Sequence, residues 1–344
     1  MNTMTVTKQR AAAQSTAAAT ELLTLAKAIN LGLRAALAAD PKVLLMGEDI
    51  ATLGGVFRVT DELVKDFGPE RVVDTPLAES GIVGTAIGLA MRGYRPVCEI
   101  QFDGFVFPAF DQITTQLAKV HYRSQGKLTL PVVIRIPYGG GIGAIEHHSE
   151  SPEVYFGHTP GLRVVTPANP ADAFTMIQEA IASPDPVIFF EPKSRYWDKG
   201  EVDLGAKVGG GLDRARVARA GSDITVVAYG PTVATALHAA EEAAKEGTSI
   251  EVVDLRAISP LDTATIADSV RRTGRCVVVH EAPVLYGTGA EIAARITEAC
   301  FYHLQAPVLR VGGFHTPYPV ARIEHDYLPN VDRVLDAVDR ALAF

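Results

Sequence analysis

Hydrophobic positions follow a helical spacing near the start of the chain and then form short continuous runs. The helical spacing predicts an amphipathic helix over residues 21–39. Its apolar positions are Leu22, Leu25, Ile29, Leu33 and Leu37. Apolar runs then alternate with helical patterns, among them residues 108–124 and 171–182. These runs predict strands at residues 43–46, 71–74, 96–100, 131–136, 162–165 and 187–190. Such strands are typical of a parallel sheet covered on both faces.

Residues 198–215 interrupt this alternation with polar residues and the three glycines 209–211, which predicts a break between domains. The alternation then resumes, with strands predicted at 224–228, 250–253, 276–279 and 307–311 and helices at 232–246, 262–273, 288–304 and 331–343. The predicted fold is α/β, with two doubly wound domains. Residues 21–200 form the first domain, 201–215 the linker, and 216–344 a smaller second domain.

Composition narrows the class of protein. The 344 residues are 47% hydrophobic and carry a net charge of −8, with acids and bases interspersed. This charge argues against nucleic acid or an anionic membrane surface as a partner. No apolar run reaches the length of a membrane span. High hydrophobicity without such a span indicates surface buried against other subunits.

Cysteine usage and the N-terminus bear on location. Cys98, Cys276 and Cys300 are scattered without metal-binding spacing, which predicts core residues in a reducing compartment. Residues 1–20 are rich in Ala and Thr and lack the apolar core of a secretory signal. We expect a disordered tail and a bacterial cytoplasmic location. A transit peptide to the mitochondrial matrix is the weaker alternative.

The most informative stretch is Asp74-Thr75-Pro76-Leu77-Ala78-Glu79. It joins a predicted strand to a helix of small residues, so Glu79 falls at the sheet edge where open parallel sheets hold ligands. The apolar helix predicts a partly desolvated carboxyl. A first-turn acid that complements the helix dipole is the simpler interpretation of this stretch alone.

Two further segments carry candidate chemistry. Residues 137–144 are Gly-rich and leave a strand without entering a helix, which predicts a mobile loop over a site more than a phosphate cradle. The loop ends in His147 and His148, and one imidazole could serve as a proton donor. Adjacent imidazoles point apart in extended chain, so a shared metal is disfavoured. A solvated loop histidine is the alternative.

In residues 99–112, a predicted strand that carries Glu99 and Gln101 leads into a segment with four phenylalanines. Such clusters are most often core, but a stacking wall for a flat heterocycle is the alternative interpretation. The sequence contains no phosphate-binding loop and no dinucleotide fingerprint after a strand. An independent NAD- or ATP-binding protein is therefore disfavoured.

Taken together, several segments resemble the beta subunit of 2-oxoacid dehydrogenases, the thiamine-diphosphate-dependent decarboxylating component of large multienzyme complexes, in the transketolase-like superfamily. These segments are residues 44–49, 74–79, 99–112, 148–153, 189–193, 254–256, 280–283 and 310–317. They cover residues 21–344. Glu-Ile-Gln-Phe, Phe-Phe-Glu-Pro-Lys and His-Glu-Ala-Pro resemble the branched-chain (2-oxoisovalerate) enzymes more than the pyruvate enzymes.

The resemblance implies roles for particular residues. Glu79 would hydrogen-bond N1′ of the aminopyrimidine of the cofactor, with Leu77, Gln101 and Phe105 also in the cofactor site. Phe105 would stack on the pyrimidine, where several branched-chain relatives have Tyr. The chemistry itself belongs to the cofactor. His148 matches the proton donor for acyl transfer to lipoamide, and His147 is the alternative donor.

The resemblance also implies partners. Thiamine enzymes bind the diphosphate and Mg²⁺ through Gly-Asp-Gly and a later Asn-Asn, and neither occurs here. An alpha subunit would supply that half of the site in an α₂β₂ heterotetramer. The C-terminal domain would dock on a dihydrolipoyl acyltransferase core that carries a lipoyl domain. A potassium ion would map near Ala180, Ser183 and Asp185.

The implied function is oxidative decarboxylation of branched-chain 2-oxoacids such as 3-methyl-2-oxobutanoate, with reductive acylation of lipoyl groups. A pyruvate or acetoin dehydrogenase beta subunit is the alternative within the same class. A non-catalytic subunit that only bridges the alpha chain and the core is the alternative outside it.

Overall fold

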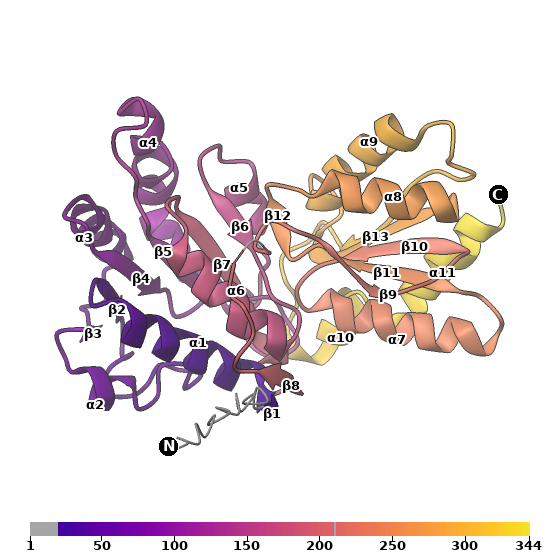
Figure 1. The fold of residues 1–344 in the computed structure, drawn as a ribbon. Helices are drawn as coiled ribbons and strands as arrows, with labels where there is room; N and C mark the ends of the chain where they lie inside the picture. Colours follow the sequence, from indigo (N-terminus) through magenta and orange to yellow (C-terminus); the bar gives the residue numbers. More distant parts are fainter. Residues whose placement is uncertain (1–19, 210) are drawn as a thin grey trace, which may run out of the picture.

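A computed structural model describes residues 20–209 and 211–344, arranged as two α/β domains (Figure 1). The predicted tail therefore lies outside the described residues, except for Thr20. The N-terminal domain is built on a seven-stranded sheet with strand order β12-β6-β7-β5-β4-β2-β3, parallel except at β12. Its strands are β2 (Val43–Gly47), β3 (Val72–Asp74), β4 (Arg95–Glu99), β5 (Val133–Tyr138), β6 (Arg163–Val165), β7 (Val187–Pro192) and β12 (Ala257–Ser259).

Helices cover both faces of this sheet, as continuous apolar strands require. Alternate residues of β2 enter different cores, Leu44 and Met46 on one face and Val43 and Leu45 on the other. On the second face α1 packs against α6. The helices are α1 (Leu25–Ala39), α2 (Leu63–Phe67), α3 (Glu79–Met91), α4 (Val120–Arg123), α5 (Glu153–Gly157) and α6 (Pro170–Ala182).

The C-terminal domain has a five-stranded sheet of order β14-β13-β10-β11-β9, parallel except for the edge strand β9. Helices α8 and α9 pack together on one face, and α7 and α11 on the other (Figure 1). The strands are β9 (Arg216–Arg219), β10 (Ile224–Ala228), β11 (Ile250–Asp254), β13 (Cys276–Pro283) and β14 (Leu309–Gly313). The helices are α7 (Thr232–Lys245), α8 (Thr263–Thr273), α9 (Thr288–Cys300), α10 (Glu324–Tyr327) and α11 (Val331–Leu342). The predicted α/β architecture with two doubly wound domains is confirmed.

The predicted start of the first helix is wrong. Residues Thr20–Thr24 form strand β1, which pairs antiparallel with β8 (Lys199–Asp203). The Thr24 hydroxyl then accepts a hydrogen bond from the Lys27 amide at 3.2 Å and caps α1. Leu22 follows the helical spacing but is 67% exposed. Strand β8 also takes the first residues of the predicted linker 201–215.

The predicted helix over residues 108–124 is helical but irregular. The segment is divided into a 3₁₀ helix at Asp103–Ala109 (η1), a π-helical turn at Gln112–Leu117 (η2) and α4. The hydroxyls of Thr114 and Thr115 each donate to a backbone carbonyl four residues earlier, at 2.8 Å. Such bonds compete with the regular helical ladder and favour local widening of the helix.

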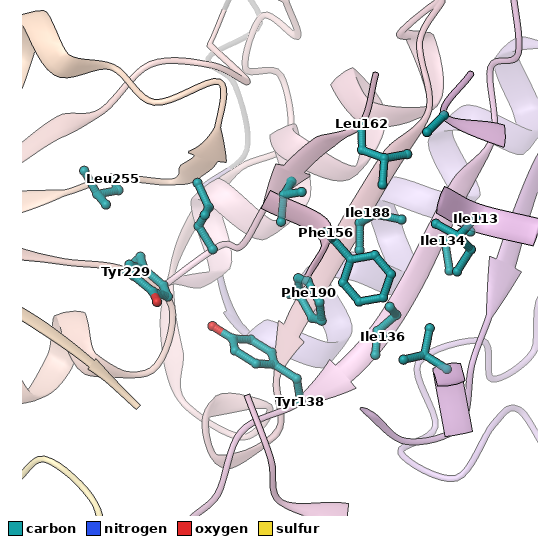
Figure 2. Packing of buried hydrophobic residues seen from close by; sticks show 14 of the residues in the cluster. Ile113, Ile134, Ile136, Tyr138, Phe156, Leu162, Ile188, Phe190, Tyr229 and Leu255 are labelled. Carbon is teal, nitrogen blue, oxygen red and sulfur yellow. The ribbon is translucent and has the colours of Figure 1, made fainter. Parts of the chain in front are cut away.

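The two domains are joined by one apolar cluster and by strand β12. Strand β12 comes from the C-terminal half of the chain, yet it pairs antiparallel with β6 at the edge of the N-terminal sheet. One apolar cluster extends from Ile134 and Phe190 in the N-terminal sheet to Tyr229 and Leu255 beyond it (Figure 2). The domain junction is therefore part of the hydrophobic core. Cys98, Cys276 and Cys300 are free and buried, as predicted for core residues.

Among residues 20–209 and 211–344, no helix combines the length and the apolar character needed to cross a membrane.

Candidate active site

Glu79 begins α3 directly after the turn from β3, at the carboxyl edge of the parallel strands. Its side chain is buried, with 7% exposed, as the apolar helix predicted. Leu77, two residues earlier, is 78% exposed. A buried acid and an exposed apolar side chain thus lie together on one short turn. This combination is typical of a site that a second molecule covers.

Glu48 follows β2 at the same edge and is also buried. Burial, followed by the negative charges of Glu79 and Asp49, raises the pKa of the Glu48 carboxyl. One of its oxygens, Oε1, is buried without a hydrogen-bond partner within the described structure. Glu48 and Glu79 therefore form a pair of acids with unused hydrogen-bonding capacity, and a ligand N–H group would satisfy it.

Gln101 lies beyond β4, and its Nε2 is 3.3 Å from Oδ2 of Asp49. Asp49 has a left-handed backbone with φ of 56°, which is uncommon for a residue other than glycine. Its carbonyl accepts a hydrogen bond of 2.9 Å from the Gly55 amide. The turn after β2 thus holds Asp49 in an uncommon backbone conformation, with its carboxylate beside Gln101.

Aromatic rings form a wall beside these polar groups. The rings of Phe102 and His148 stack, with centroids 3.9 Å apart and planes inclined by 22°. Phe105 meets His148 edge-on at 5.1 Å. Phe105 lies in η1, which packs against α3, so the wall adjoins the helix that Glu79 begins. Phe102 and Phe105 are half-buried, and so this part of the aromatic segment is a surface wall.

The two histidines occupy different environments. His148 Nδ1 lies 3.0 Å from the His147 carbonyl oxygen, which leaves Nε2 as the ring nitrogen open to exchange a proton. Burial is the main cause that lowers the pKa of His148, and the positive charges of His147 and Lys193 act in the same direction. His147 Nδ1 lies 3.4 Å from a Glu146 carboxylate oxygen at the surface. The structure thus brings His148, more closely than His147, into the aromatic wall.

Backbone amides of the Gly-rich loop bind carboxylates, and the predicted mobility of the loop stays a prediction. The Gly140 amide donates to Glu281 at 2.9 Å. The amides of Gly141 and Gly143 donate to the two oxygens of Glu324 at 2.9 and 3.1 Å. Both acids belong to the C-terminal domain. These amides are therefore occupied within the chain and join the two domains.

Sequence reasoning missed a buried ionic network behind the site. Arg135 on β5 donates to Glu99 at 2.6 Å and to both oxygens of Glu191 at 2.6 and 3.0 Å. The Tyr196 hydroxyl donates to Glu191 at 2.6 Å. All four side chains are buried. A single arginine inside the apolar run 131–136 was the available signal, because a buried guanidinium requires carboxylate partners.

The carbonyl oxygens of the three potassium candidates already accept hydrogen bonds within the chain. The Ala180 carbonyl accepts from the Ser183 amide at 3.2 Å, and the Asp185 carbonyl accepts from the Ser183 hydroxyl at 3.0 Å. The Ser183 carbonyl faces the Arg95 guanidinium at 3.4 Å, a charge that opposes a cation. Nowhere in residues 20–209 or 211–344 do three His, Cys, Asp or Glu side chains converge as metal ligands. The potassium site stays a prediction.

The remaining residues fit half of a thiamine diphosphate molecule. Glu79 and the unpartnered oxygen of Glu48 offer acceptors to a nitrogen heterocycle, and the rings of Phe102 and Phe105, which meet edge-on with planes inclined by 84°, offer apolar surface nearby. Gln101 adds an amide at the same edge. The sequence lacks the Gly-Asp-Gly and Asn-Asn elements expected for the diphosphate and Mg²⁺. These residues therefore suit the pyrimidine end of the cofactor better than its charged end.

Comparisons with known proteins identify both domains. Residues 21–198 match the transketolase pyrimidine binding domain, and residues 213–334 match the transketolase C-terminal domain. A solved structure described as a split gene transketolase, inactive beta4 tetramer, aligns with a TM-score of 0.76 at 25% identity. The alignment covers 93% of this chain and 98% of the other.

Two relatives cover nearly the whole chain. The pyruvate dehydrogenase E1 component subunit beta of Leifsonia xyli subsp. xyli is 62% identical over 322 residues, 94% of this chain and 95% of the relative. The 3-methyl-2-oxobutanoate dehydrogenase subunit beta of Mycobacterium tuberculosis is 55% identical over 324 residues, 94% of this chain and 93% of the relative. The expected family is confirmed: this chain belongs to the transketolase-like beta subunits of the E1 component of 2-oxoacid dehydrogenases.

Proposed function

We propose that this chain supplies the pyrimidine half of a thiamine diphosphate site, with Glu79 as the group that binds the pyrimidine ring nitrogen. The observation that carries the proposal is the buried pair Glu48 and Glu79, which has no cationic partner within the described residues and leaves one carboxylate oxygen unpartnered. A buried acid without a structural partner is a candidate for binding and proton transfer.

Each residue has a part in this proposal. The bound cofactor supplies the electron sink for decarboxylation of a 2-oxoacid. Glu79 holds a proton at the pyrimidine nitrogen, Phe105 packs against the ring, and Gln101 and Leu77 border it. The aromatic wall excludes water from this edge and strengthens the hydrogen bond of the acid.

His148 is proposed as the proton donor when the acyl group passes to a lipoyl group. Support comes from its position, stacked on Phe102 with Nε2 free, at the end of the wall that Phe105 shares. A lowered pKa makes the imidazolium a stronger acid, which favours proton release.

We further propose an alpha subunit that contributes the diphosphate and Mg²⁺ half, in an α₂β₂ heterotetramer in the bacterial cytoplasm, and docking to a dihydrolipoyl acyltransferase core. Exposed Leu77 and the open positions Gly84 and Gly88 on α3 support a partner beside Glu79. The split transketolase is described as inactive when its beta chains assemble as a tetramer. This description agrees with a chain that needs a second subunit for activity.

For the substrate we propose a branched-chain 2-oxoacid such as 3-methyl-2-oxobutanoate. Support comes from the segments Glu99–Phe102, Phe189–Lys193 and His280–Pro283 and from the Mycobacterium tuberculosis relative. Pyruvate is the second candidate, favoured by the name of the Leifsonia xyli relative at 62% identity and by Phe at position 105.

The decisive experiment assembles the chain with its alpha subunit and measures kcat/KM for 3-methyl-2-oxobutanoate and for pyruvate. We expect the branched acid to react with the higher kcat/KM, and a reversed ratio would replace the branched-chain assignment with the pyruvate assignment. The same assay on Glu79→Gln separates a catalytic subunit from a structural bridge. Unchanged turnover in that variant would contradict the catalytic role.

A further inference from the structure

A fully buried ion pair lies directly behind the candidate proton donor. Asp103 begins η1 after β4, and Lys193 begins a 3₁₀ turn after β7 (Lys193–Arg195). The Lys193 ammonium donates to Asp103 Oδ1, and both side chains are 0% exposed. A buried ion pair is costly to desolvate and is weak evidence for a stabilising role, which leaves a positioning role open to it.

The pair contacts the turn that carries His148 in two ways. Asp103 Oδ2 accepts a hydrogen bond of 2.9 Å from the Glu150 amide, two residues after His148. Lys193 Nζ lies 5.6 Å from the centroid of the Phe102 ring, which stacks on the imidazole of His148. One contact fixes the backbone of the turn, and the other fixes the ring against which His148 packs.

Gly104 adds a third constraint. A Cβ atom at position 104 would lie 2.4 Å from the His147 carbonyl oxygen, so only glycine permits this approach of the turn. That carbonyl is the group which Nδ1 of His148 contacts at 3.0 Å. Three consecutive residues, Phe102, Asp103 and Gly104, therefore all press against the segment 147–150.

We infer that Asp103 and Lys193 are positioning residues for His148, which they hold against Phe102 with Nε2 open towards the site. This inference rests on the proposed role of His148 as proton donor. The pair acts through the turn and the ring, without touching the substrate itself. Holding a reacting group in place can be worth as much as two orders of magnitude in rate.

The electrostatic surroundings agree with this role. Burial is the main cause that raises the pKa of Asp103 to about 6 and lowers that of Lys193, and their mutual attraction opposes both shifts. The charged groups around His148 are His147 and Lys193, which lower its pKa, and Glu146, which raises it. Loss of the pair should hydrate His148, which raises the pKa of its imidazole, while the removed charges of Lys193 and Asp103 act on it in opposite directions.

The test uses the full chain assembled with its alpha subunit and the double variant Asp103→Asn/Lys193→Met, which keeps the side-chain shapes without charge. Hydrogen exchange at the C2 position of His148, followed by mass spectrometry, reports its titration directly. Two rates are also measured: acylation of a lipoyl domain, and decarboxylation with an artificial electron acceptor. The matched control is Glu251→Gln, which removes a buried carboxylate partner of Arg272 in the C-terminal domain.

The expected result is a rise of about half a unit or more in the His148 titration midpoint. Lipoyl acylation should fall roughly tenfold or more, while decarboxylation with the artificial acceptor changes little. An unchanged His148 titration, or an equal loss of both rates, would overturn the inference. Phe102→Leu, which leaves the ion pair intact, is measured in the same way if the double variant does not fold.

Two separate measurements test the role of His148 as proton donor and the role of Asp103 and Lys193 in positioning it. If His148→Gln leaves lipoyl acylation intact, His148 is not the proton donor and the proposed function loses that step. The titration of His148 in the double variant still decides whether Asp103 and Lys193 hold its ring.

Discussion

Two groups of buried acids lie at the carboxyl edge of the same sheet, and they differ in their partners. Glu48 and Glu79 lie beyond β2 and β3, the charge of Glu79 helps to raise the pKa of Glu48, and neither acid has a salt-bridge partner among residues 20–209 and 211–344. Glu99 and Glu191, on β4 and β7, both bind Arg135 on β5 between them. The second group has the charge balance that a protein interior demands, and the first does not.

The acids paired with Arg135 belong to the scaffold, whereas Glu48 and Glu79 belong to the candidate site. Carboxylates paired with a guanidinium have used their hydrogen-bonding capacity and hold neighbouring strands together. Carboxylates left without a partner keep that capacity for a ligand, at a cost in stability to the free chain. The paired group is enclosed by strands β4, β5 and β7, whereas the unpaired group lies beside exposed Leu77, where a ligand or subunit can reach it.

The largest expected effect comes from removing the cation of the paired group. Arg135→Met leaves Glu99 and Glu191 buried without a counter-charge, and we expect a loss of about 3–5 kcal/mol in the free energy of unfolding. Urea unfolding followed by circular dichroism measures it. Arg163→Met, which breaks a partly exposed pair with Asp213, serves as the control and should cost about 1 kcal/mol or less. Equal losses in both variants would mean that Arg135 does not hold the scaffold.

Next in size is the effect of Glu79→Gln on turnover. Losing the ionisable group should lower kcat of the assembled enzyme roughly 100-fold or more, because the amide cannot exchange a proton with the cofactor. The Tm should stay level or rise slightly, since repulsion from Glu48 disappears. Glu99→Gln is the matched variant from the paired group, and it should lower the Tm more than it lowers turnover per folded enzyme. If both variants changed Tm and turnover in the same proportion, the distinction between the paired and the unpaired acids would be wrong.

The smallest effect is expected for Glu48→Gln. The pKa of Glu48 is raised in the folded chain, so its contribution to stability is greatest at low pH and is lost as pH rises through the folded value. The variant should therefore gain a few degrees in Tm over wild type above neutral pH and match it in acid. Thermal unfolding across pH 4–9 checks this. A constant Tm difference at every pH would point to packing as the cause.

Periodicity was a reliable guide wherever burial alone decides the structure. Ile224–Ala228 and Val187–Phe190 are continuous apolar runs, and both are strands with apolar cores on each face. It failed where side-chain hydrogen bonds compete with helical propensity. Thr24 stops the first helix at its N-terminus, and Thr114 and Thr115 distort the segment after η1.

In the candidate site, too, local features could be predicted from the sequence and long-range contacts could not. Glu79 could be chosen from the sequence because it stands at a strand-to-helix turn, which is a local feature. Glu48 and Asp103 could not, because their significance depends on residues such as Lys193, 90 positions away in the chain from Asp103. The hydrogen bonds from the Gly-rich loop to Glu281 and Glu324 could not be predicted either, since a glycine amide can donate to any carboxylate that the fold brings near.

The sequence by itself determined the alternation of strands and helices, the two-domain α/β class, and the family to which the chain belongs, because hydrophobic spacing and short motifs are local properties. The tertiary structure alone decided which acids are neutralised and which remain open, because a carboxylate acquires its partner from whichever strand lies beside it. It likewise placed β12 in the sheet of the other domain and His148 against Phe102, since both contacts join segments that are distant in the chain.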